Sequence, residues 1–97
     1  MTLISEERLC TYLSRVLDLS QELLAVVPER GAEAMSADDP LRVAFERLVH
    51  DLGSERGNDT YLDDESWNWI WEGKEEYNPI RIYGRLAWIN LQLLELL

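Results

Sequence analysis

The sequence has a single cysteine, few basic residues and no long apolar run, and each scarcity excludes a class of protein. With Cys10 alone, the 97-residue chain cannot form an intrachain disulfide, which excludes a disulfide-stapled secreted scaffold. No segment approaches the roughly 20 consecutive apolar residues that a membrane-spanning helix requires. The first ten residues lack a basic segment followed by an apolar run, so they do not resemble a signal peptide. We therefore expect a cytoplasmic protein that does not enter a membrane.

The shortage of basic residues gives the chain a net charge of −10, from nine Lys and Arg against 19 Asp and Glu. Binding to nucleic acid or to an anionic membrane needs clustered Lys and Arg, so neither is expected as a direct partner. The charge is also uneven, because the segment 51–76 holds nine acidic and two basic residues. A basic protein partner is the expectation, and the source is expected to be bacterial or phage. The ratio of eight Arg to one Lys is typical of a GC-rich genome.

The pattern of apolar residues and breakers predicts an all-α fold, a compact bundle of three to four helices in one domain, 1–97. Ser5 is a natural N-cap for the first helix, and Pro28 is expected to end it. Asp38 or Asp39 precedes a proline at the start of the second helix, and Gly53 is expected to close that helix. The helices are predicted at about 5–27, 40–52, 65–72 and 79–97.

The third predicted helix carries three tryptophans at alternate positions, and two structures are compatible with that spacing. On a helix, Trp67, Ile70 and Trp71 share one face and enter the core, whereas Trp69 points away from it. On a strand, all three rings lie on one side. The helix is preferred, because a lone strand would have no partner within the chain.

No arrangement of residues predicts catalysis, a metal site or a cofactor. The sequence has no paired nucleophile and base and no glycine-rich phosphate loop. The carboxylates near residue 60 do not match the spacing of a calcium-binding loop. Cys10 lies beside the apolar stripe of the first helix and is expected to be a buried, unreactive thiol. The protein is therefore predicted not to be an enzyme and to bind no cofactor or metal.

The favoured function is a non-enzymatic protein–protein interaction module, a small acidic inhibitor that caps a basic surface of its partner. Its carboxylates would imitate nucleic-acid phosphates, as immunity proteins or phage anti-defence proteins do, and an outward tryptophan would anchor the complex. The predicted partner-binding residues combine acids with that one ring: Asp63, Asp64, Glu65, Trp69, Glu72, Glu75 and Glu76.

The alternative is a structural or regulatory subunit that assembles through its Leu-rich C-terminal helix, for example as a homodimer. Nine of the last twelve residues are apolar, and a helix that is apolar on most sides is usually central in a bundle or shared with a second subunit. The predicted self-association residues come from this helix: Trp88, Leu93, Leu94 and Leu97.

Overall fold

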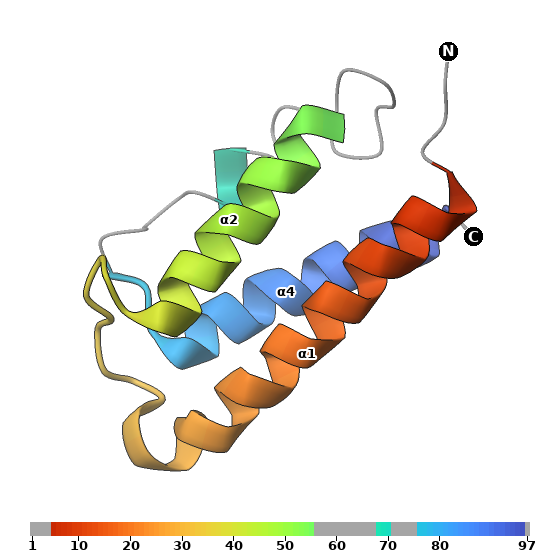
Figure 1. The fold of residues 1–97 in the computed structure, drawn as a ribbon. Helices are drawn as coiled ribbons and strands as arrows, with labels where there is room; N and C mark the ends of the chain where they lie inside the picture. The colour runs from red at the N-terminus through yellow and green to blue at the C-terminus, as the bar shows by residue number, and fades with distance from the viewer. Residues whose placement is uncertain (1–4, 56–67, 71–75, 97) are drawn as a thin grey trace.

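The computed structural model describes residues 5–55, 68–70 and 76–96, and the regular structure in these ranges is entirely helical (Figure 1). Three helices make up most of it: α1 (Glu6–Arg30), α2 (Pro40–Glu55) and α4 (Pro79–Leu94). Of the predicted third helix, residues 68–70 are described, and they are helical. The prediction of an all-α bundle is confirmed, and none of the helices in the described ranges is both long and apolar enough to cross a bilayer.

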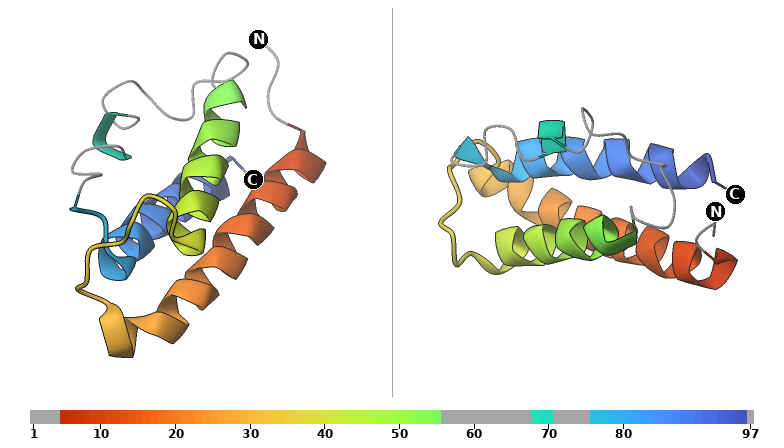
Figure 2. Two further views of the ribbon diagram at one scale, coloured as in Figure 1. Left: turned by 60° about the vertical axis from the view of Figure 1, so that its left-hand side comes forward. Right: turned by 90° about the horizontal axis from the view of Figure 1, so that it is seen from above.

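Helix α1 packs against both other helices, and its contact with α4 is the more extensive. The start of α1 and the end of α4 lie at the same end of the molecule, so these two helices run antiparallel (Figures 1 and 2). Helix α2 covers a different side of α1, as the view from above shows (Figure 2). One side of the α1–α4 pair therefore has no described helix packed against it.

Among the described residues, the core is one cluster of 16 buried apolar side chains. Helix α1 contributes residues at steps of three and four, and α4 does the same with Ile82, Leu86, Ile89 and Leu93, the spacing of a helix that buries one face. Non-helical segments also contribute, through Met35 and Tyr77. Helix α4 buries the stripe that its spacing predicts, whereas α1 buries Tyr12 and Leu19, which lie outside its predicted stripe.

The helix starts are as predicted, whereas α1 and α2 end later than predicted and α4 ends at Leu94, before the predicted residue 97. The side chains of Ser5 and Asn78 accept hydrogen bonds from the third residue of α1 and α4. Helix α1 continues through Pro28 to Arg30, because a proline in the last turn removes only one hydrogen bond. Helix α2 continues through Gly53 to Glu55; glycine costs about 1 kcal/mol there but does not forbid the helical conformation.

Asp39, and not Asp38, caps α2. Its Oδ1 accepts from the backbone N–H of Leu41 at 2.9 Å, and its Oδ2 lies 2.9 Å from Nη1 of Arg30. Burial of the carboxyl opposes ionisation, but the Arg30 hydrogen bond and the backbone N–H groups of Leu41 and Arg42 outweigh it. The pKa of Asp39 is therefore lowered. The cap ties the end of α1 to the start of α2.

Tyr77 contacts both the short helical segment at 68–70 and helix α2. Its side chain is completely buried, and its hydroxyl donates to the carbonyl oxygen of Ile70. Phe45 of α2 meets the ring edge-on at a centroid distance of 5.5 Å, and the Arg42 guanidinium lies 5.6 Å from its centroid. Burial raises the pKa of Tyr77, because the phenolate is poorly solvated there.

Candidate protein-interaction surface

Most of the predicted acidic contact set lies outside the described residues: Asp63, Asp64, Glu65, Glu72 and Glu75. The described members are Trp69 and Glu76. Glu76 is exposed, and its Oε2 lies 3.7 Å from Nη1 of Arg81. Exposed ion pairs of this kind contribute about 0–1 kcal/mol, so the pair neutralises charge more than it stabilises the fold.

The expectation that Trp69 points away from the core is wrong. The side chain is half-buried and packs against the core, with the Arg85 guanidinium 3.9 Å from its ring centroid and Trp88 edge-on at 5.5 Å. Arg85 and Trp88 are one turn apart on α4, so both side chains contact the indole of Trp69. Helical geometry alone predicted the direction of Trp69 relative to Ile70, but it could not predict that α4 lies on that side.

The four predicted self-association residues differ in their exposure to solvent. Leu93 is 0% exposed and belongs to the core, so it cannot form a seam with a second molecule. Trp88 is half-buried against Trp69, and Leu94 is exposed. Leu97 lies outside the described residues. The helix that was predicted to self-associate therefore keeps an apolar surface, but through other side chains.

That surface is a row of five exposed, uncharged residues along α4: Ile80, Gly84, Ala87, Leu91 and Leu94. They recur at alternating steps of four and three, the spacing by which one helix packs on another. The row lies opposite the buried stripe of the same helix. Leu91 is the most exposed large apolar side chain of the described residues, at 60%.

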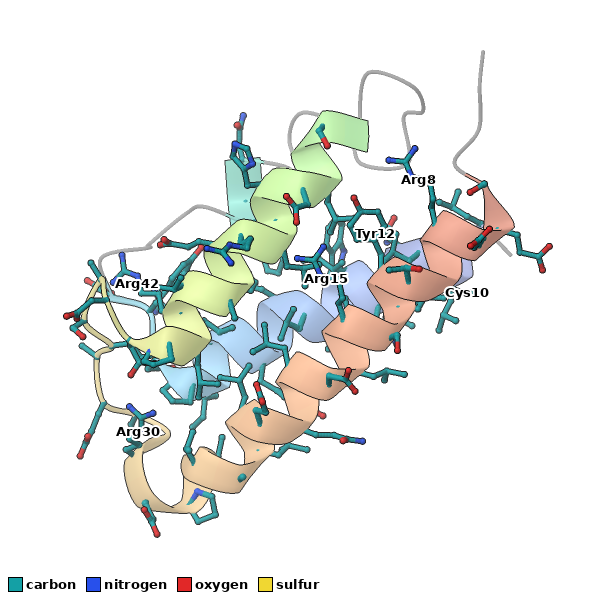
Figure 3. The ribbon with its side chains drawn as sticks, viewed as in Figure 1. Arg8, Cys10, Tyr12, Arg15, Arg30 and Arg42 are labelled. Carbon is teal, nitrogen blue, oxygen red and sulfur yellow. The ribbon has the colours of Figure 1, made fainter. Side chains whose placement is uncertain are left out.

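A second row of uncharged residues runs along α1: Cys10, Ser14, Leu17, Gln21 and Leu24, all exposed. The expectation that Cys10 is buried is therefore wrong. In Figure 3, Arg15 lies on the side of α1 that faces α2, and Cys10 lies on the other side. The Arg15 guanidinium is 2.9 Å from a carboxylate oxygen of Asp51, an ion pair that joins α1 to α2.

The two rows are joined by a groove of about 320 Å³ between α1 and α4, to which Leu17, Ala87 and Leu91 contribute directly. Ser20, Tyr83 and Asn90 add neutral polar groups to its wall. We call the α4 row, the α1 row and this groove the neutral face. It carries five of the six exposed large apolar side chains of the described chain; the sixth, Val43, is on α2.

The groove on the other side of α1 has the opposite character. It has a volume of about 260 Å³, lies between α1 and α2, and is lined by Arg15, Asp18, Glu22 and Arg47 as well as apolar groups. The charged residues in the middle of α1 therefore lie beside α2, and its neutral residues lie beside α4. The segregation of charge makes the neutral face a distinct surface.

Within the ranges 5–55, 68–70 and 76–96 there is no group of three or more His, Cys, Asp or Glu side chains that could hold a metal ion. The chemistry that the neutral face offers is the burial of apolar area, with a few uncharged hydrogen-bonding groups at its centre. Such a surface suits contact with another protein.

Comparison with models of known protein families, with curated proteins and with solved structures finds no match. The functional argument therefore rests on the chain's own residues.

Proposed function

We propose that the protein is a non-enzymatic protein–protein interaction module that docks through its neutral face. The observation that carries this proposal is a contrast in charge. The chain has a net charge of −10, whereas the two adjacent rows, with five exposed residues each, contain no charged residue. Isolated exposed apolar residues are ordinary on a protein surface, but a contiguous patch along two helices marks an interaction site.

The spacing of the α4 row favours a helix as the element that docks there. Side chains at alternating steps of three and four present a straight ridge that fits between the ridges of a second helix. Gly84 in the middle of the row supports this. A Cβ at Gly84 would meet nothing within 4 Å, so no contact inside the chain explains a residue that weakens a helix by about 1 kcal/mol.

The proposal is tested by affinity capture from the native host with three baits. The first is the wild type, the second carries Leu17→Glu and Leu91→Glu, and the third carries Val43→Glu. Val43 is a matched control, because it is an exposed aliphatic residue on α2, outside the neutral face. Partners should be lost from the second bait and kept by the third. Retention of every partner by the second bait would refute docking through this face.

The acidic inhibitor remains a second candidate, and the distribution of ion pairs favours it. Arg15, Arg30, Arg42 and Arg81 each lie within 4 Å of a carboxylate, so the described basic side chains are largely neutralised inside the chain. The chain has 19 acidic residues against nine basic ones, so its acidic charge remains in large excess. A negatively charged surface of this kind would attract a basic partner.

A fourth bait, with Asp63, Asp64, Glu72 and Glu76 changed to Lys, separates the two candidates. If the protein is an acidic inhibitor, its partner is lost from this bait and retained by the variant with Leu17→Glu and Leu91→Glu. The reverse result supports docking through the neutral face.

A further inference from the structure

We infer that the neutral face binds a second copy of the chain, so that α1 and α4 of two molecules pack into a four-helix interface. This inference rests on the proposed function and names the partner of the same surface. Three features of the face point to a second copy: its lack of charge, the shape of its α4 row, and its size.

Charge restricts where two copies can meet. Each copy carries −10, so contact through most of the surface would place carboxylates of one molecule against carboxylates of the other. From Cys10 to Leu24 and from Ile80 to Leu94, the exposed rows of the neutral face contain no acidic residue. Two copies can therefore approach through this face without direct repulsion, whereas a strongly basic partner would gain nothing from it.

The shape of the face is complementary to itself. Leu17 of the α1 row and Leu91 of the α4 row lie at the groove and are more than half exposed. Gly84 and Ala87 of the α4 row have small side chains or none, so they are low points of the surface. In a two-fold symmetric contact each molecule offers the same patch, so the leucines of one copy meet the low points of the other. The open space at Gly84 permits this close approach of two helices.

The size of the face is adequate for a stable dimer. Helix α4 has 16 residues, which corresponds to about 24 Å of length, and two adjacent helices are about 20 Å wide. The projected area is therefore roughly 480 Å² per copy, and the accessible area of the ridged surface is larger. A specific interface buries at least about 1,000 Å² in total, and two such faces reach that size.

The inference is tested by sedimentation equilibrium and light scattering of the full chain, from micromolar to millimolar concentration. The wild type should be a dimer that dissociates on dilution. Leu17→Glu with Leu91→Glu should raise the dimer dissociation constant by about a hundredfold, because it places four carboxylates in one apolar interface. Val43→Glu should leave it unchanged. Circular dichroism establishes that each variant is folded.

Two further measurements separate this apolar contact from an electrostatic one. Added salt should tighten the dimer, because it screens the repulsion between two negatively charged copies.

Gly84→Ala should raise the melting temperature of dilute, monomeric protein, because alanine favours the helix, and should weaken dimerisation by crowding the contact. A mutation that damaged the fold would instead lower the melting temperature of the monomer and the stability of the dimer together.

A wild type that remains monomeric at millimolar concentration overturns the inference. If the variant with Leu17→Glu and Leu91→Glu still loses its captured partners, the proposed function survives and the partner is another protein. A dimer that this double variant does not weaken would also overturn the inference, because the contact would then lie on a different surface.

Discussion

Replacing Tyr77 by phenylalanine should destabilise the protein by about 1–3 kcal/mol. The change removes the hydroxyl that donates to the Ile70 carbonyl and keeps the ring that meets Phe45 and Arg42. A neutral hydrogen bond contributes about 0.5–1.5 kcal/mol net, and a buried carbonyl left without a donor adds a penalty. Both Tyr77 and Ile70 are 0% exposed, so water cannot easily replace the hydroxyl.

The measurement is urea unfolding followed by circular dichroism, with Tyr83→Phe as the control. Tyr83 is partly buried at the groove between α1 and α4, so in dilute, monomeric protein removal of its hydroxyl should change the free energy of unfolding by less than about 0.5 kcal/mol. For a chain of this size, a loss of 1 kcal/mol corresponds to a fall in melting temperature of about 4–8 °C. If Tyr77→Phe unfolds at the same urea concentration as wild type, the hydroxyl makes no net contribution and the reasoning is refuted.

The same residue gives the protein a dependence on alkaline pH. Because burial raises the pKa of Tyr77, the folded state disfavours its phenolate. The stability that this group supplies is fully present below the unfolded pKa of about 10 and is lost as the pH rises through the folded value. Phenolate absorbance should therefore include a step from Tyr77 that appears above the pH at which a free tyrosine ionises. Tyr77→Phe should remove that late step.

Three other substitutions and one control test the fold. Gly31→Ala should cost about 1–3 kcal/mol in thermal unfolding, because a Cβ there would lie 2.7 Å from the carbonyl oxygen of Val27. Asp39→Asn should cost about 1 kcal/mol at neutral pH. Because the pKa of Asp39 is lowered, that difference should be present above the unfolded pKa of about 3.9 and disappear as the pH falls through the folded value, as acid titration of stability would show. Leu93→Ala should cost about 2–5 kcal/mol, whereas Leu91→Ala in dilute protein should cost less than about 0.5 kcal/mol in urea unfolding.

The helices could be predicted from the sequence because their signals are local. An N-cap such as Ser5 or Asn78 acts within one turn, and the apolar steps of α1 and α4 follow the period of the helix itself. The two errors at helix ends, Pro28 and Gly53, have a common cause. Each residue weakens a helix without forbidding it, and the packing of the flanking buried residues decides whether the helix continues.

The candidate surface was harder to predict, because it depends on which helices are neighbours. The apolar character of α4 was clear from the sequence, but Leu93, which was predicted to self-associate, lies in the core, and Leu91 is the exposed leucine. Trp69 was taken as exposed because no single-helix argument can place Arg85 and Trp88 beside it. The regular steps from Ile80 to Leu94 were the available signal, and they needed the position of the core to be interpreted.

The neutral face and the negative charge act together if the protein assembles as inferred. A chain with an apolar helical surface and little net charge tends to associate in several ways, because nothing opposes the wrong contacts. Here the net charge of −10 on each copy opposes contacts outside the neutral face, so repulsion favours a two-fold contact through that face over the alternatives. The described acidic residues lie outside the neutral face, so a dimer would present them from both copies. A basic partner would therefore meet two acidic surfaces, and the two candidate functions would become parts of one mechanism.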